Sequence, residues 1–168
     1  MEKILIIGLG NPILTDDGVG VKVAYEVEKA IGTNLPANLT ITEASVGGLR
    51  LMELLIGFDR VILIDALLTE TDGKTGEIHH MSFDDLRNIS PTQHSASAHD
   101  TSLVTAVDAG REMGFHLPEN FSIYAISVEN ILDFSEEPTP AVAAAIPEVT
   151  KAVLEELEGI LGNQNSTM

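Results

Sequence analysis

The sequence contains no cysteine and no tryptophan, and only 4% of its residues are aromatic. The absence of cysteine excludes disulfides, thiolate nucleophiles and cysteine-ligated zinc. A reducing compartment is consistent with this composition, and we expect a cytoplasmic protein. Because 44% of the residues are hydrophobic but few are aromatic, the core is predicted to consist mainly of Val, Ile, Leu and Ala.

Basic residues are also scarce, since 9 Lys and Arg stand against 26 Asp and Glu, and the formal net charge is −17. Nucleic acids and anionic membranes need a basic surface, so neither is an expected partner. No apolar run reaches the roughly 18 residues of a membrane span. The first apolar run, Ile4 to Leu9, indicates a core strand rather than a signal peptide. The acidic excess is compatible with solubility, a cationic partner or a metal ion.

Apolar runs and helical periodicities alternate along the 168 residues, which predicts one α/β domain over residues 1–162 and a frayed tail at 163–168. Strands are expected at 4–9, 39–43, 60–66, 77–81 and 120–128, and helices at 17–31, 47–56, 100–113 and 139–161. Residues 67–82 are interpreted as a hairpin-like excursion, and Pro147 is expected to kink or divide the last helix. The alternation favours a three-layer αβα sandwich with a twisted, largely parallel sheet.

The segment after the first strand, GLGNPILTDDGVG, contains a glycine-bearing turn. Gly8 and Gly10 could bring the backbone close to a phosphate, but Ile13 stands where a dinucleotide-binding turn needs its third glycine. The segment also lacks the Gly-Lys-Ser/Thr ending of a phosphate-binding loop. A tight structural turn is therefore the favoured interpretation.

Polar residues at the ends of separate elements form the candidate site. Asp16 and Asp17 open the first helix, where one can cap it and leave the other as a ligand or base. Asp65 ends an apolar strand, where a buried carboxylate needs a partner or a metal. His99, like His94 in the same polar loop, comes just before a helix. Ligands gather beyond the carboxyl ends of parallel strands, so Asp17, Asp65 and His99 could converge on a divalent transition metal with open positions.

Three segments, GLGNPILTDDGVG, LIDAL and SAHDTSL, resemble the nickel–iron hydrogenase maturation endopeptidases in order and spacing over nearly the whole chain. The resemblance implies a phosphorylase/hydrolase-like α/β domain with Asp17, Asp65 and His99 as metal ligands. It also implies the reaction, one cut that removes the C-terminal extension of a [NiFe] hydrogenase large subunit precursor after nickel insertion. The expected partner is that precursor, and the expected metal is its nickel, with Zn or Cd as substitutes in isolation. The oligomeric state is open, with a monomer favoured.

The resemblance leaves the role of the metal open. Either the metal polarises the scissile carbonyl and acidifies a water, or it only docks the substrate while Asp16 or Asp17 acts as general base. The predicted catalytic residues are therefore Asp17, Asp65, His99 and Asp16. One loop departs from the family pattern, because residues 43–48 read EASVGG where many relatives have Gly-Gly-Thr or Gly-Thr.

Two other functions compete with this interpretation. The GLGNP opening also resembles peptidyl-tRNA hydrolases, but LTDD at positions 14–17 replaces their Thr-Arg-His-Asn segment, and the acidic charge opposes tRNA binding. The second alternative is a non-catalytic module that binds a metal or a nucleotide. Such a module would bind its ligand without cleaving a peptide bond.

Overall fold

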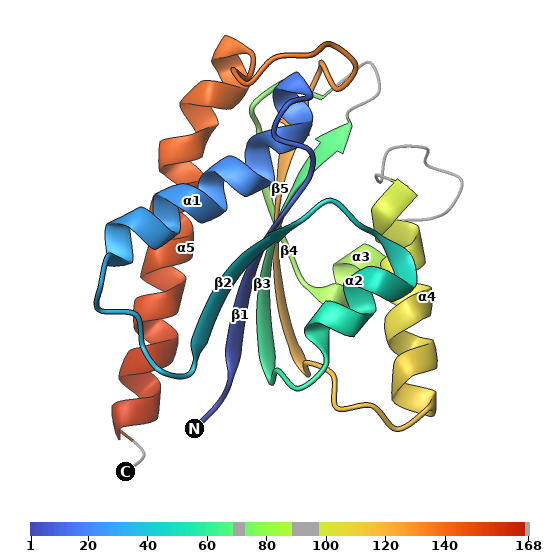
Figure 1. Cartoon of the computed structure of the whole chain (residues 1–168), viewed down its shortest axis with the longest axis vertical. Helices are drawn as coiled ribbons and strands as arrows, with labels where there is room; N and C mark the ends of the chain where they lie inside the picture. Colours follow the sequence, from blue (N-terminus) through green and yellow to red (C-terminus); the bar gives the residue numbers. More distant parts are fainter. Residues whose placement is uncertain (69–72, 89–97, 167–168) are drawn as a thin grey trace.

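The computed structural model describes residues 1–68, 73–88 and 98–166, and the side chains of 98–102 and 164–166 lie outside that description. At its centre is a sheet with the strand order β2-β1-β3-β5-β4 (Figure 1). The strands are β1 (Ile4–Leu9), β2 (Leu39–Ala44), β3 (Arg60–Leu68), β4 (Ile78–Met81) and β5 (Asn120–Val128). β1, β2, β3 and β5 run parallel, and only β4 is antiparallel to its neighbour. The prediction of a largely parallel sheet is confirmed.

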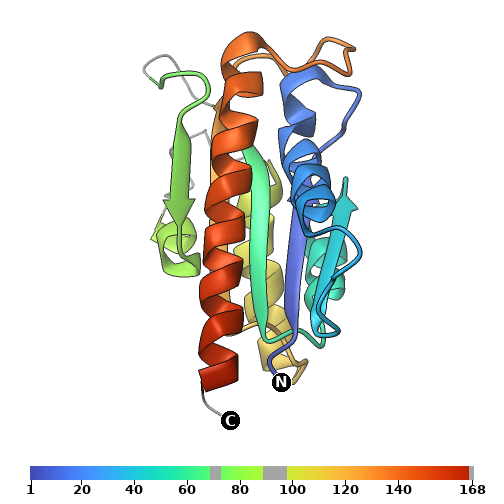
Figure 2. The same ribbon diagram turned by 90° about the vertical axis from the view of Figure 1, so that its left-hand side faces the viewer.

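Helices cover both faces of this sheet, as Figures 1 and 2 show. One face carries α1 (Val19–Ile31) and α5 (Pro140–Ser166), and the other carries α2 (Gly48–Leu55), α3 (Phe83–Asn88) and α4 (Ala98–Glu112). The three-layer αβα sandwich predicted from the sequence is therefore confirmed.

The alternation of side chains along each strand builds two separate hydrophobic cores. Ile4 and Ile6 of β1 pack in the core beneath α1 and α5, whereas Leu5 and Ile7 pack beneath α2, α3 and α4. All four side chains are almost completely buried. This burial on both faces explains why the parallel strands appear in the sequence as continuous apolar runs.

The segment between β3 and α3 differs from the prediction, because β4 does not form a hairpin with β3. β3 is paired along its whole length with β5, from Arg60 opposite Asn120 to Leu68 opposite Val128. With β1 on the other side of β3, no edge of β3 is left for β4. β4 instead pairs with the outer edge of β5, from Ile78 opposite Ile126 to Met81 opposite Ile123.

The last helix is longer and more continuous than predicted. α5 contains Pro147 in its interior and is not divided there. Proline cannot donate a hydrogen bond to the carbonyl of Ala143, so one helical hydrogen bond is missing at this point. The helix continues to Ser166, so regular structure extends into the predicted tail at 163–168. None of the helices in the described part of the chain has the length and apolarity needed to cross a membrane.

Candidate active site

The candidate site lies where β1 ends and α1 begins, beside the part of β3 that extends past its pairing with β1. A short 3-10 helix, η1 (Thr15–Gly18), connects the turn after β1 to α1. A Cβ atom built on Gly20 would overlap the carbonyl oxygens of Leu9 and Ile64, so the first turn of α1 lies directly against the end of β1 and the middle of β3. Because Asp65 follows Ile64, this contact places Asp65 at the same edge of the sheet as η1, which carries Asp17.

Asp17 is held by the turn that precedes it. Its Oδ2 atom accepts a hydrogen bond from the backbone N–H of Asn11 at 2.8 Å. The backbone of Asp17 packs against Gly10, whose φ of 129° requires glycine at this position. The side chain is partly exposed, and its Oδ1 makes no hydrogen bond to any other described residue. Asp17 therefore presents one fixed carboxylate with an oxygen available for a ligand.

Asp65 is the second acidic residue at this edge, and its side chain is only 4% exposed. Its Oδ1 accepts a hydrogen bond from the backbone N–H of Ala66 at 2.8 Å. The prediction that Asp65 ends its strand is wrong, because β3 continues to Leu68. Asp65 instead follows Ile64, the last residue of β3 that pairs with β1. Two carboxylates at one edge, one buried and one partly exposed, provide hard oxygen donors that suit a divalent cation.

Asp16 differs from its neighbour because it is completely buried and fully hydrogen-bonded. Its Oδ2 accepts from the backbone N–H groups of Glu129 and Asn130 at 3.3 and 3.1 Å. Its Oδ1 accepts from the backbone N–H and the hydroxyl of Thr139 at 2.7 and 3.0 Å. Asp16 thus ties η1 to the segment between β5 and α5. The catalytic role predicted for Asp16 stays a prediction, but its carboxylate is buried and both of its oxygens already accept hydrogen bonds from this segment.

The two acids do not cap α1 as the sequence suggested. The residue before α1 is Gly18, and no side chain forms a capping hydrogen bond there. Asp16 and Asp17 instead hold two different loops in place, one on each side of η1. The pair was explained from the sequence as one cap and one spare acid, and the capping part of that explanation is wrong.

His99 lies near the beginning of α4, and its side chain is outside the described part of the structure. α4 leads into β5, which begins beside the first residue of β3, so the N-terminus of α4 points toward the carboxyl edge of the sheet (Figure 1). His94 is outside the described residues altogether. Among the side chains that the structure does describe, no three metal-ligating residues lie close enough to share an ion. The convergence of Asp17, Asp65 and His99 therefore stays a prediction.

The remaining histidines make ordinary contacts with neighbouring side chains. The Nε2 of His79 lies 3.0 Å from the hydroxyl of Ser127, and that of His80 lies 2.6 Å from the hydroxyl of Ser122. His116 pairs with Asp59 at 2.8 Å, at the opposite edge of the sheet.

Sequence reasoning missed the residues that hold the acidic pair in place. Asn11 positions Asp17 through its backbone, and its side chain accepts from the N–H of Ile13 at 3.2 Å. Thr15 has a positive φ of 43°, which is unusual for a residue with a branched side chain. Its hydroxyl donates to the carbonyl of Asp133 at 2.6 Å, which helps to hold this conformation. The Asn-Pro pair marked a turn in the sequence, but nothing local indicated contacts with residues more than 110 positions away.

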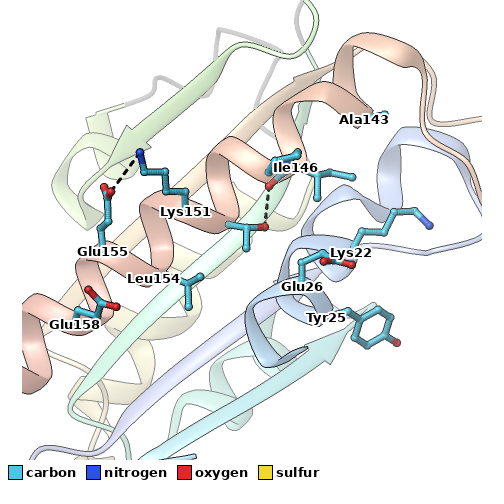
Figure 3. A pocket seen from close by; sticks show the side chains of 11 residues that line it. Lys22, Tyr25, Glu26, Ala143, Ile146, Lys151, Leu154, Glu155 and Glu158 are labelled. Atoms are coloured by element: carbon cyan, nitrogen blue, oxygen red, sulfur yellow. Dashed lines mark hydrogen bonds and ion pairs between the residues drawn. The ribbon is translucent and has the colours of Figure 1, made fainter. Parts of the chain in front are cut away.

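A groove of about 780 Å³ runs between α1 and α5 on the outer surface of the helical layer (Figure 3). Ile146 and Leu154 contribute apolar side chains to its lining, and charged side chains such as Lys22 and Glu158 also line it. None of the four predicted site residues is part of this lining, so the groove is separate from the carboxylate pair.

Comparison with known proteins identifies the family to which the chain belongs. The family model described as hydrogenase maturation protease matches residues 21–156 of the chain. The chain therefore belongs to the hydrogenase maturation protease family, and the family predicted from its motifs is confirmed.

Curated relatives and solved structures support the same assignment. A putative hydrogenase maturation protease of Methanocaldococcus jannaschii is 34% identical over 61% of this chain, and the match spans 63% of that relative. The hydrogenase 2 maturation protease of Escherichia coli is 26% identical over 90% of this chain and 88% of its own. The solved structure of the hydrogenase maturating endopeptidase HybD from E. coli has a TM-score of 0.74 at 25% identity, covering 94% of this chain and 93% of that one.

Proposed function

We propose that this protein is an endopeptidase that removes the C-terminal extension of a [NiFe] hydrogenase large subunit precursor once nickel has been inserted. Family membership supports proteolysis in hydrogenase maturation. The observation that carries the proposal to the site is the placement of Asp17 and Asp65 at one edge of the sheet, beside the contact of α1 with β1 and β3. We expect the reaction in the cytoplasm.

The nickel of the precursor is part of the substrate in this proposal. Asp17 and Asp65 would contact it through carboxylate oxygens, and His99 would contribute a ring nitrogen from the start of α4. Three protein ligands leave positions for the groups by which the precursor already holds its metal. A precursor without nickel would lack this anchor, so cleavage would depend on complete loading.

Among the acids, Asp17 suits the role of general base better than Asp16. Its Oδ1 makes no hydrogen bond to another described residue, whereas both oxygens of Asp16 accept hydrogen bonds from buried donors. A base must approach the water whose proton it takes, and a partly exposed carboxylate at the edge can do so. Asp16 would then act as a positioning residue for η1.

The direct test incubates the protein with nickel-loaded precursor and with the same precursor lacking nickel, and measures the product mass. We expect a shortened product only from the loaded precursor. Asp17→Asn, Asp65→Asn and His99→Ala should each abolish it. Asp84→Asn and His116→Ala are matched controls, because Asp84 is exposed on α3 and His116 lies at the opposite edge. Full activity of all three site variants would contradict the site, and an intact loaded precursor with wild-type protein would contradict the function.

A non-catalytic metal- or nucleotide-binding module is the competing function. It predicts that wild-type protein binds the loaded precursor or a nucleotide and leaves its mass unchanged. The same assay therefore separates the two. The peptidyl-tRNA hydrolase alternative is no longer supported, because the GLGNP segment on which it rested belongs to a chain of the hydrogenase maturation protease family.

A further inference from the structure

Two large apolar side chains project into solvent from the loop between β5 and α5, residues 129–139. Leu132 and Phe134 are each 82% exposed, more than any other large apolar side chain in the described part of the chain except the N-terminal Met1. Ile13, on the neighbouring turn, is 47% exposed. Such side chains carry a cost in water that only a covering surface removes.

The backbone of the loop that carries these side chains is ordered by hydrogen bonds. The side-chain oxygen of Asn130 accepts hydrogen bonds from the backbone N–H groups of Leu132 and Asp133, at 3.3 and 3.2 Å. Its amide nitrogen donates to the carboxylate of Asp133 at 2.8 Å. The hydroxyl of Ser135 accepts from the N–H of Glu137 at 3.0 Å. Leu132 and Phe134 are therefore displayed by an ordered loop, so covering them would cost little backbone entropy.

The loop is also joined to the turn that positions Asp17. The N–H of Ser135 donates to the carbonyl of Ile13 at 3.0 Å, and the N–H of Thr15 donates to the carbonyl of Ser135 at 2.9 Å. Asp16 adds the hydrogen bonds to the loop described above. The exposed apolar residues and the turn that positions Asp17 therefore belong to one hydrogen-bonded unit. Figure 1 shows the loop before α5 and the start of α1 at the same end of the sheet.

All charged residues of the loop 129–139 are acidic. Glu129, Asp133, Glu136 and Glu137 are all exposed. The sequence has no lysine or arginine between Arg111 and Lys151. A partner that covers Leu132 and Phe134 would bring its own charges next to these acids, so a basic surface is complementary and an acidic one is excluded.

We propose that Leu132, Phe134 and Ile13 form the docking surface for the large subunit precursor, and that they contact a segment of it carrying apolar side chains flanked by lysine or arginine. The inference rests on the proposed function, because it identifies the precursor as the occupant. Docking here would place the bound segment beside Asp17, since the same turn carries Ile13 and Asn11. The surface would determine which precursors are cleaved and leave the chemical step to the carboxylates.

The test compares Leu132→Ser/Phe134→Ser with wild-type protein in cleavage of nickel-loaded precursor and in direct binding to it by biolayer interferometry. The control is Met113→Ser/Phe115→Ser, because these exposed apolar residues follow α4 at the opposite edge of the sheet. We expect the loop variant to raise KM and the binding Kd about tenfold or more, with kcat nearly unchanged. The control variant should match wild type. Glu136→Lys/Glu137→Lys should weaken binding mainly through a slower association rate at low salt.

Unchanged Kd and KM in the loop variant would overturn the docking surface while leaving the protease function intact. If wild-type protein fails to cleave, the proposed function fails, and the binding measurement still decides whether this surface contacts the precursor. Sedimentation of both proteins addresses the other occupant, a second copy of this chain. A wild-type dimer that the loop variant converts to a monomer, with precursor binding unchanged, would also overturn the proposal.

Discussion

The carboxylate of Asp16 accepts hydrogen bonds from both the backbone N–H and the hydroxyl of Thr139, at 2.7 and 3.0 Å, across 123 positions of sequence. This contact joins the beginning of α1 to the beginning of α5. Asp17 holds the turn on the other side of η1 through Asn11. Two adjacent acids therefore have different partners, and substitutions at these positions should have different consequences.

Asp16→Asn should destabilise the fold strongly. The new side-chain amide keeps one acceptor oxygen, but its NH₂ group replaces the other. That group would face backbone N–H donors that now bind a carboxylate oxygen, and it cannot accept from them. We expect the free energy of unfolding to fall by about 2–4 kcal/mol, the range for leaving buried donors without an acceptor at a charged site. Urea denaturation followed by circular dichroism measures this value. Asp17→Asn should change it by less than about 1 kcal/mol, because Oδ1 of the new amide can still accept from Asn11.

The Asp16→Asn and Asp17→Asn variants also distinguish a structural role from a catalytic one. At a temperature where both variants are folded, Asp16→Asn should retain cleavage of nickel-loaded precursor, and Asp17→Asn should have none. Single-turnover rates on equal amounts of folded protein provide the measurement. A reversed result, with activity lost only in the Asp16 variant, would make Asp16 the base.

Gly20→Ala should separate α1 from the strand ends. A Cβ at this position would overlap backbone oxygens of Leu9 and Ile64, which cannot move as a flexible side chain can. We expect a loss of about 1–3 kcal/mol in stability, the range for an overpacked contact, together with reduced cleavage because Asp17 and Asp65 move apart. Thermal unfolding and the cleavage assay test both parts.

Gly159→Ala is the matched control for that substitution. Gly159 lies in α5 with open space around the position of a Cβ. Alanine there should raise stability by about 0.5–1 kcal/mol and leave cleavage unchanged. Equal effects at Gly20 and Gly159 would show that the close approach of α1 to the strands is unimportant.

The sequence predicts the parallel part of this fold well because each buried strand is a continuous apolar run. The segment 120–128 was expected to contain a strand and is occupied by β5, and the strand expected at 60–66 is two residues longer in β3. The edge strand β4 is a different case. Its position along the chain was predicted nearly correctly. Its partner strand could not be predicted, because β5 occupies the edge of β3 where β4 would otherwise pair, and this depends on the arrangement of the whole sheet.

The candidate site could be predicted in part from the sequence for a similar reason. Asp65 could be located because a carboxylate at the end of an apolar run is conspicuous. The difference between Asp16 and Asp17 could not be predicted, because it arises from Glu129, Asn130 and Thr139, which are distant in sequence. The exposure of Leu132 and Phe134 was also hidden, since apolar letters in a sequence normally indicate burial.

Stability should depend on pH through Asp59. Its carboxylate accepts from the backbone N–H of Lys3 at 2.7 Å and pairs with His116 at 2.8 Å, and these contacts lower its pKa below the ordinary value of 3.8. A lowered pKa stabilises the folded state above the ordinary pKa, and the contribution is lost as pH falls through the folded value. The urea midpoint of unfolding should therefore fall as the pH drops below the ordinary pKa of 3.8.

Asp59→Asn provides the comparison for this pH dependence. The variant should be less stable than wild type at pH 6, and the difference should shrink as pH falls below 4. Urea midpoints at both pH values measure it. A difference that stays constant across this range would assign the effect of the substitution to something other than the carboxylate charge.

The central claim is that Asp17, Asp65 and His99 bind one metal ion at the carboxyl edge of the sheet. Anomalous diffraction from crystals of the protein with Cd²⁺ tests it most directly. We predict one strong peak with carboxylate oxygens of Asp17 and Asp65 and a ring nitrogen of His99 as ligands, and its loss in His99→Ala crystals. A peak that lacks any of these three residues, or an imidazole of His99 that lies far from both carboxylates, would contradict the claim.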